Sequence, residues 1–243
     1  MEKKHLSFSR FKRFEQCEAA ALADWQPVSK TALLEGKYFE AYLTDADLIR
    51  FGEDHPDIYK KGGTILKKAY ADAGETAEKL LEHDEIRYII NRCVKQMPVS
   101  GEIAGVPFIG YIDLFDKKTG DEYDVKYMRS FAKLWSPVEY AKVDWYFAYG
   151  YHYQAAIYRE LSKSIKPGGK QHIIAATKET VPDFGFWQFD KKIIDDALGI
   201  VEAYAPRYYA ILNGEIEPKR CEHCEYCRST RVLDKPIIID MFG

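Results

Sequence analysis

The fold is decided by a short stretch of the chain, residues 106–128, which reads VPFIGYIDLFDKKTGDEYDVKYM. Both ends of the stretch are rich in the β-branched and aromatic residues that favour strands, and residues 116–120 between them form a charged segment that ends on glycine. The stretch therefore predicts a β-hairpin. Because side chains alternate between the two faces of a strand, Asp124 and Lys126 should point one way while the bulky residues on either side of them point the other.

The polar residues of this hairpin suit the binding of a divalent cation. Asp113 lies on the first predicted strand and Asp124 on the second, and hard cations prefer oxygen ligands such as carboxylates. Lys126 is expected beside the same carboxylates, where its ammonium group can hold a water molecule and stabilise negative charge. Hydrolysis of a phosphodiester bond needs activated water and charge stabilisation of this kind. Since Asp-x-Lys is a common tripeptide, an ordinary charged surface hairpin is the alternative.

A later helix supplies a second pair of polar residues. Residues 145–161, WYFAYGYHYQAAIYREL, predict an apolar, aromatic helix in which Gln154 and Tyr158 share one face because they are four residues apart. The order of the motifs resembles the PD-(D/E)XK nuclease superfamily: Asp113 first, then Asp124-x-Lys126, then a Q-x-x-x-Y helix. The likeness is to the RecB-like branch, and within it to the phage-type exodeoxyribonuclease VIII-like group, and it covers nearly the whole chain.

The resemblance implies a role for each motif residue. Asp113 and Asp124 would bind Mg²⁺ or Mn²⁺, Lys126 would be the catalytic lysine, and Gln154 with Tyr158 would contact DNA and order the site. The activity implied is that of an exonuclease on linear DNA in phage or mobile-element recombination, a role whose partner would be a single-strand annealing recombination protein. From the residues themselves, several basic side chains are candidate contacts to DNA phosphates, with solvated surface residues as the alternative: Arg129, Lys133, Lys126, Lys142, Arg159, Arg10, Lys12 and Arg13.

One metal ligand departs from the family pattern. Family members commonly carry a histidine one turn after a glycine on an early helix, and Glu40, after Gly36, stands at that position here. A glutamate still offers oxygen, so Glu40 with Asp113 and Asp124 would form an all-oxygen site that favours Mg²⁺ or Mn²⁺. A solvated helix residue is the alternative for Glu40, and Glu102 is a further candidate ligand of lower rank.

The cysteines predict a second metal site. Three of the five lie near the carboxyl end as Cys221-x-x-Cys224-x-x-Cys227, and without a secretory signal such a cluster indicates metal binding rather than disulfides. Residues 7–17 resemble the amino-terminal motif of iron–sulfur members of the same nuclease branch, in which one early and three late cysteines hold a [4Fe-4S] cluster. The resemblance makes Cys17 the fourth ligand. Zinc stays open, because Cys₄ and Cys₃His sites also bind it and His223 lies within the cluster.

Composition predicts one globular domain. We expect a single domain over residues 1–243, with a helical amino-terminal part (1–97), a catalytic core (98–190) and a carboxyl-terminal helix with the cysteines (191–243), because 47% hydrophobic residues supply a large core. No apolar span approaches the roughly 20 residues that cross a bilayer, so we expect a cytoplasmic protein without membrane contact. The net charge of −3 argues against a broad basic coat for DNA, although a groove can be basic locally.

The pattern of elements predicts an α/β fold, with a central mixed β-sheet flanked by helices. A turn at residues 166–169 precedes two further strands, QHIIAATKE and FGFWQFD. A long helix should start at Asp190 and end near Gly214, with a kink at Pro206. The other helices are predicted over residues 8–23, 31–46, 64–82, 84–96, 137–143 and 145–163.

Two other classes of protein remain open on the sequence. One is a DNA-binding recombination accessory protein that keeps the fold but has lost the chemistry, with Glu40 as its sign. The other is a zinc-stabilised interaction module. Ring-shaped oligomers occur among the exonucleases that the chain resembles, yet no residue pattern specifies a symmetric interface.

Overall fold

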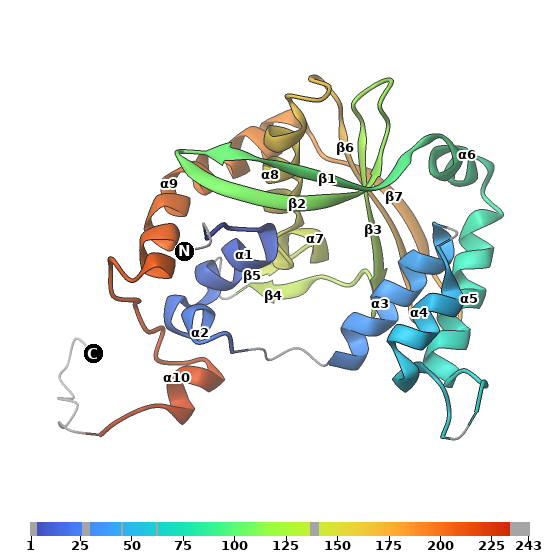
Figure 1. Cartoon of the computed structure of the whole chain (residues 1–243), viewed down its shortest axis with the longest axis horizontal. Helices are drawn as coiled ribbons and strands as arrows, with labels where there is room; N and C mark the ends of the chain where they lie inside the picture. Colours follow the sequence, from blue (N-terminus) through green and yellow to red (C-terminus); the bar gives the residue numbers. More distant parts are fainter. Residues whose placement is uncertain (1–3, 26–29, 45, 62, 137–140, 234–243) are drawn as a thin grey trace.

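A five-stranded mixed sheet lies at the centre of the protein, with the strand order β1-β2-β3-β6-β7 (Figure 1). The structure is a computed structural model that describes residues 4–25, 30–44, 46–61, 63–136 and 141–233. Neighbouring strands are antiparallel except β3 and β6, which run parallel. The strands are β1 (Val94–Ile103), β2 (Val106–Phe115), β3 (Glu122–Met128), β6 (Gln171–Thr177) and β7 (Phe184–Gln188), and a separate ribbon pairs β4 (Leu134–Ser136) with β5 (Ala141–Val143).

Helices cover both faces of the sheet. The residues of α3, α5 and α6 pack on one face, and those of α1, α8 and α9 pack on the other. The helices are α1 (Phe8–Gln16), α2 (Glu18–Leu22), α3 (Lys30–Leu43), α4 (Leu48–Asp54), α5 (Lys68–Leu81), α6 (Asp84–Arg92), α7 (Trp145–Ala148), α8 (Tyr151–Ser162), α9 (Lys191–Asn213) and α10 (Glu225–Ser229), and a 3₁₀ turn covers Pro56–Ile58. Among the described residues, no helix is both long enough and apolar enough to cross a membrane.

The predicted hairpin is present, but its two strands pair over a short distance only. Leu114 lies opposite Tyr123 and Phe115 opposite Glu122, next to a turn closed by the amide of Asp116 donating to the carbonyl of Asp121 at 2.9 Å. Beyond these two pairs β2 continues alongside β1, while β3 continues alongside β6 (Figure 1). The strands therefore separate at the position of Asp113.

The predicted alternation along β3 is also present. Tyr123 and Val125 are buried in the core formed with α3, α5 and α6. Asp124 and Lys126 point to the opposite face, toward α8. One face of β3 thus stabilises the fold, and the other is available for chemistry.

The helix predicted over residues 84–96 is present as α6 but ends earlier, at Arg92, and the helix predicted over residues 137–143 is wrong in its described part. Residues 94–96 belong to the edge strand β1 rather than to a helix, since Pro98 cannot continue a helix but is accepted in an edge strand. Residues 141–143 form β5 instead of a helix, and the rest of that prediction, residues 137–140, lies outside the described part of the chain.

Two other predicted helices are each divided in two. Cys17 is extended between α1 and α2, and Gly150, with φ +71°, separates α7 from α8. The long helix α9 follows the prediction: the carboxylate of Asp190 accepts a hydrogen bond from the amide of Lys192, Gly214 ends the helix with φ +80°, and Pro206 lies inside it.

A pair of glycine substitutions tests the packing around the hairpin turn. A Cβ at Gly169 would lie 1.8 Å from the carbonyl oxygen of Gly120, which is backbone and cannot rotate away. We expect Gly169→Ala to lower the free energy of unfolding by about 1–3 kcal/mol, measured by urea denaturation. Gly199 lies inside α9, and outside the helix's own backbone a Cβ there would have no atom within 4 Å. Gly199→Ala should therefore raise the free energy of unfolding by as much as about 1 kcal/mol. Equal stability of the two variants would contradict this packing.

Candidate active site

Asp113 is held where the two hairpin strands separate. Its Oδ2 accepts a hydrogen bond of 2.9 Å from the backbone amide of Val125, so the carboxylate takes the place of a strand–strand hydrogen bond. A buried amide needs such a partner, which explains why the strands can separate here at little cost. Asp113 is therefore positioned by the backbone of β3 as well as by its own strand.

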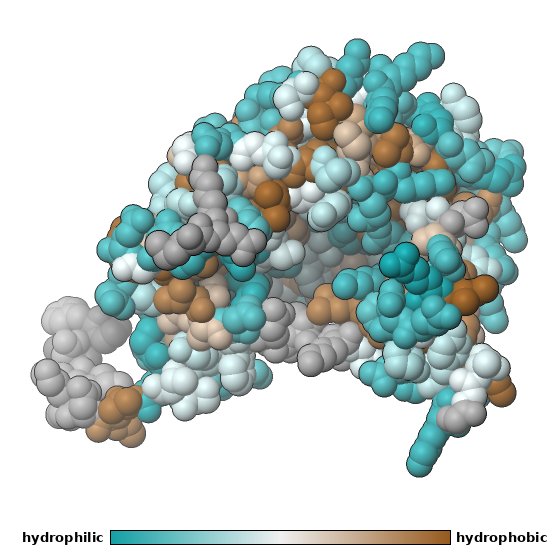
Figure 2. All heavy atoms as spheres, viewed as in Figure 1, coloured by the Kyte–Doolittle hydropathy of each residue, from teal (hydrophilic) through white to brown (hydrophobic). Residues whose placement is uncertain are grey.

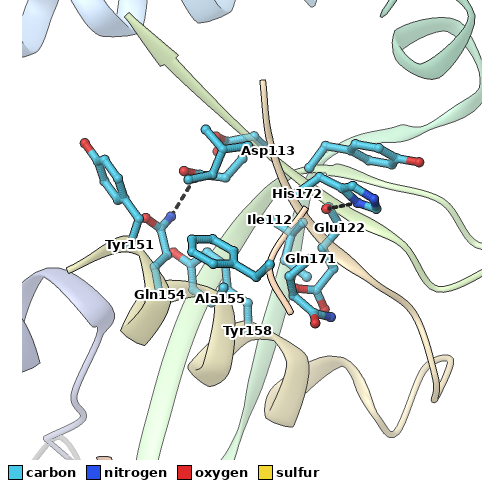
Figure 3. Close-up of a pocket in the computed structure, with 13 residues that line it drawn as sticks. Ile112, Asp113, Glu122, Tyr151, Gln154, Ala155, Tyr158, Gln171 and His172 are labelled. Carbon is cyan, nitrogen blue, oxygen red and sulfur yellow. Dashed lines mark hydrogen bonds between the residues drawn. The ribbon is translucent and has the colours of Figure 1, made fainter. Parts of the chain in front are cut away.

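Asp124 and Lys126 form a half-buried ion pair next to Asp113. The Nζ atom of Lys126 lies 2.6 Å from Oδ1 of Asp124 and 3.9 Å from Oδ2 of Asp113. The side-chain amide of Gln154, on α8, donates to the same Oδ1 of Asp124 at 2.7 Å (Figure 3). The other oxygen of Asp124, Oδ2, is buried and has no hydrogen-bond partner among the described residues. It is thus an acceptor that can still take a ligand.

Glu40 reaches this cluster from α3. The helix is placed against β3 by Phe39, whose ring stacks on that of Tyr127 at 4.6 Å between centroids. The amide nitrogen of Gln96 donates to Glu40 and, at 3.3 Å, to Oδ1 of Asp113, so the two carboxylates share one donor. The structure therefore brings all three predicted carboxylate ligands together.

Gln96 is a site residue that the sequence did not reveal. It lies on β1 directly across from Asp113, between the pairs Lys95–Leu114 and Met97–Ile112. Its φ of +49° is unfavourable for a residue with a side chain, and such strain is often found at functional sites. Because the sequence pattern predicted a helix over this segment, no signal placed Gln96 opposite Asp113.

Burial and the neighbouring carboxylates raise the pKa values of Glu40 and Asp124. Burial, followed by the charge of Asp113, raises the pKa of Glu40 to about 8. Burial also raises the pKa of Asp124 to about 7, against the opposing charge of Lys126. Burial alone would lower the pKa of Lys126, but Asp124 and Asp113 more than offset it and raise the value. One ammonium group thus faces three acidic groups, an arrangement that favours an additional cation.

Helix α8 closes the site on the other side. A cavity of about 20 Å³ between α8 and the sheet is lined by Asp113, Asp124, Gln154 and Tyr158, and it has room for about one water molecule (Figure 3). The ring of Tyr158 lies so close to β2 that a Cβ at Gly110 would be 2.5 Å from it. The predicted Gln154–Tyr158 pair therefore faces the carboxylates.

Three other candidates lie apart from this cluster. Glu102 lies opposite Pro107 at the far end of the β1–β2 pair, about 20 Å along the strand from Gln96, so it cannot join the three carboxylates. Arg129 is exposed beyond the end of β3. Lys133 is 59% exposed and pairs with Asp144 at 3.5 Å. For Arg129 and Lys133, contact with phosphate stays a prediction.

The four predicted cysteines come together at a second site. Their sulfur atoms all lie within 4.8 Å of one another, with 3.6 Å between Cys17 and Cys227 and 3.9 Å between Cys221 and Cys227. The cluster is a candidate metal site that joins the early and late parts of the chain. Cys93, the fifth cysteine, is buried elsewhere, in the core with α3, α5 and α6.

Contacts beside the cysteines hold the same segments together. Glu18 of α2 accepts hydrogen bonds of 2.7 and 2.8 Å from the guanidinium group of Arg207 on α9, and one of 2.6 Å from the amide of Lys219. The amide of Ala19 in turn donates to the carbonyl of Lys219. The cysteines are therefore brought together by protein contacts and do not depend on a metal alone.

Comparisons with known structures identify the same fold. A crystal structure described as a "Putative exonuclease" from Eubacterium rectale is similar with a TM-score of 0.84 and 29% sequence identity, over 96% of this chain and 91% of that one. A structure of SSO0001 matches with a TM-score of 0.33 and 15% identity, over 83% of this chain and 95% of the other, a likeness too low to support an argument. No curated protein was found to match.

A family model described as "PDDEXK-like domain of unknown function (DUF3799)" matches residues 7–230. This range contains both the three carboxylates and the four cysteines. The predicted α/β fold with a central mixed sheet is confirmed by the structure together with this match. The chain belongs to the family of PDDEXK-like domains.

Proposed function

We propose that the chain is a Mg²⁺- or Mn²⁺-dependent deoxyribonuclease that hydrolyses phosphodiester bonds of linear DNA. The observation that carries the proposal is the cluster of Glu40, Asp113 and Asp124 beside one half-buried lysine, Lys126, at the point where β2 and β3 separate. This arrangement occurs on a PDDEXK-like fold, and it matches the order of motifs in the sequence.

The donor atoms fit a hard divalent cation. Asp124 keeps one buried oxygen without a protein partner, and the carboxylates of Asp113 and Glu40 are linked to each other through Gln96. Oxygen ligands of this kind suit Mg²⁺ and Mn²⁺. A cation bound there would stabilise charge on the phosphoryl oxygens and favour ionisation of the attacking water.

The chain's own residues would orient the reactants. Lys126 donates to Asp124 and, at 3.2 Å, to the carbonyl of Val125, so its third N–H group can donate to an attacking water or to a phosphate oxygen. Gln154 holds one oxygen of Asp124, which leaves the other for ligand binding. Tyr158 keeps the inner wall of the cavity closed against β2.

The shape of the protein allows a nucleic acid to approach. Figure 2 shows a hollow in the surface between the side chains over α1 and α2 and those over α3 and α4, and Figure 1 shows β3 running behind it. We propose that DNA enters along this hollow, with Arg129 and Lys133 as phosphate contacts at the end of β3. Helix α3, on one side of this hollow, carries Glu40 of the carboxylate cluster.

The finer part of the proposal is an exonuclease that acts in phage or mobile-element recombination in the cytoplasm. Its support is the likeness of the motifs to the phage-type exodeoxyribonuclease VIII-like group and the description of the similar structure from Eubacterium rectale as an exonuclease. A single-strand annealing protein is the partner that such a role would need.

A cleavage assay tests the activity and its direction. We expect wild-type protein with Mg²⁺ or Mn²⁺ to degrade linear duplex DNA and leave circles intact, and EDTA to stop it. Lys126→Ala should slow cleavage by about 10²–10³-fold because a preorganised charge is lost, and Asp113→Ala should abolish it. Lys118→Ala, in the exposed hairpin turn, is the control for loss of one positive charge.

Three results of this assay would contradict the proposal. Cutting of circular DNA would point to an endonuclease. Metal-independent DNA binding without cutting would favour the accessory protein. Unchanged cleavage rates in Lys126→Ala and Asp113→Ala would show that these residues take no part in catalysis.

Thermal denaturation tests the metal ligands separately from activity. Without a cation, Glu40→Gln should melt at the same temperature as the wild type or higher, because one of three repelling carboxylates is gone. Millimolar Mg²⁺ or Ca²⁺ should raise the melting temperature of the wild type, and the rise should be smaller in Glu40→Gln. Glu102→Gln should keep the wild-type rise, since Glu102 lies far along β1. Equal rises in all three proteins would exclude Glu40 as a ligand.

We also propose that the four cysteines bind a metal as thiolates. A zinc–sulfur bond of about 2.3 Å gives sulfur–sulfur separations of about 3.8 Å in a tetrahedron. The separations of 3.6 and 3.9 Å from Cys227 lie near that value, and all four sulfur atoms lie within 4.8 Å of one another. A [4Fe-4S] cluster, which the C-x-x-C-x-x-C spacing favours, would require the thiolates to move apart because iron and sulfide would lie between them. The positions of the sulfur atoms therefore favour a single tetrahedral ion, and zinc is the metal that we propose.

Metal analysis of anaerobically purified protein decides between the two metals. One zinc per chain without visible absorption is the expected result, and four irons with a broad visible band would establish the cluster instead. Cys17→Ser should lose the metal, whereas Cys93→Ser should retain it because Cys93 lies in a separate core. Metal retained in Cys17→Ser at the wild-type amount would contradict the four-cysteine site.

A further inference from the structure

Helix α1 brings a second lysine to the candidate active site. The Nζ atom of Lys12 lies 5.2 Å from the centre of the Tyr149 ring and 5.9 Å from that of Tyr151. The Nζ atom of Lys126 lies 5.0 Å from the same Tyr151 ring. Lys12 and Lys126 are 114 positions apart in the sequence, and they share one aromatic neighbour beside the carboxylates.

Lys12 lacks the carboxylate partner that Lys126 has. Lys126 is paired with Asp124 at 2.6 Å, whereas no carboxylate in the described part of the chain forms an ion pair with Lys12. The negative charge of Glu15 raises the pKa of Lys12 by less than the surroundings lower it. Burial, followed by the positive charge of Lys126, lowers the pKa of Lys12 to about 8. A half-buried cation that is repelled by its neighbour would be stabilised by an anion.

The two other basic residues of α1 make contacts within the protein. Arg10 donates to the carbonyl of His5 at 2.9 Å, and Arg13 pairs with Asp24 at 2.7 Å. Phe11 and Phe14 are buried in the core, which fixes the helix. Among the basic residues of α1, Lys12 is thus the one directed at the site.

The path of the Lys12 side chain is defined by close packing. Gly150, the left-handed residue before α8, would place a Cβ 3.9 Å from Cδ of Lys12 and 3.3 Å from the ring of Tyr153. The stem of Lys12 therefore runs past the junction of α7 and α8 to reach the tyrosine rings. The ammonium group is held in place before any ligand binds, which lowers the entropy cost of binding one.

We propose that Lys12 binds the phosphate of a nucleotide that neighbours the scissile phosphate. The inference rests on the proposed function and deepens it by adding a substrate-binding residue from the amino-terminal helix. A strand whose scissile phosphate lies beside Lys126 would bring a neighbouring phosphate within reach of Lys12, because both Nζ atoms lie within 5.9 Å of the centre of one ring. The phosphate would form the direct ion pair that no carboxylate in the described part of the chain forms with Lys12.

A structural role is the competing explanation. Cation–π contacts of Lys12 with Tyr149 and Tyr151 could simply support the packing of α1. That role predicts a loss of stability without any dependence on a particular phosphate. The two explanations therefore differ in their response to the charge of the DNA backbone.

The test uses duplex oligonucleotides in which one phosphate near the cleaved end is replaced by a neutral methylphosphonate. The substitution is moved one position at a time, and kcat/KM is measured for the wild type, Lys12→Met, Lys12→Arg and Lys118→Ala. Lys12→Met keeps the apolar stem and removes the charge, and Lys118→Ala is the exposed control. Melting temperatures confirm that each variant is folded.

On unmodified DNA, Lys12→Met should lower kcat/KM roughly tenfold or more, mainly through KM, because a charge-assisted hydrogen bond is lost. Lys12→Arg should recover most of the loss. When the methylphosphonate replaces the phosphate that Lys12 binds, kcat/KM of the wild type should fall to that of Lys12→Met, so that the two proteins no longer differ. For binding of unmodified DNA in Ca²⁺, the slope of the logarithm of the binding constant against the logarithm of the salt concentration should be smaller by about one in Lys12→Met than in the wild type.

Failure of this inference can be told apart from failure of the proposed function. If the wild type cuts DNA while Lys12→Met matches Lys118→Ala on every substrate, the role of Lys12 is overturned and the nuclease stands. If the wild type cuts no DNA, the proposed function fails. The binding measurement in Ca²⁺ then decides on Lys12, and equal salt slopes in the wild type and Lys12→Met would overturn it.

Discussion

The candidate site depends on one hydrogen bond, from the amide of Val125 to the carboxylate of Asp113. Strands β2 and β3 pair at only two positions before they diverge, and a diverging strand leaves a buried amide without a partner. Asp113 satisfies that amide with its side chain. The same contact therefore allows the sheet to open and fixes one carboxylate at the opening, and the positions of Asp124 and Lys126 follow because they lie on either side of Val125.

A cluster of buried charges of this kind opposes folding, and the surrounding packing makes it tolerable. Glu40 and Asp124 both have raised pKa values, which shows that the ionised groups are less stable here than in water. The opposite face of β3 offsets this cost, because Tyr123 and Val125 are buried against α3, α5 and α6. Helix α8 contributes from the other side, where Gln154 satisfies one carboxylate oxygen. A bound cation would supply the positive charge that one lysine cannot give to three acidic groups.

Helix α1 connects the two sites of the protein. Its buried phenylalanines anchor it in the core, Lys12 extends from it toward Tyr151 and Lys126, and its chain ends at Cys17 in the cysteine cluster. The Glu18–Arg207 ion pair fastens the next turn to α9. The amino-terminal segment is thus both a structural link between the chain ends and a wall of the candidate active site.

The sequence by itself determined the motif residues on the hairpin and on α8. Asp124 and Lys126 alternate along one strand, and Gln154 and Tyr158 share one turn of one helix, so local periodicity is enough to put each pair on one face. The tertiary structure decided which distant residues join them. Gln96 enters through the pairing of β1, whose first residues, 94–96, were predicted to be helical, and the same pairing places Glu102 far away. Lys12 enters through the packing of α1 against the α7–α8 junction. Contacts of this kind depend on strand register and helix packing, and these are set by the burial of the whole core rather than by local residue spacing.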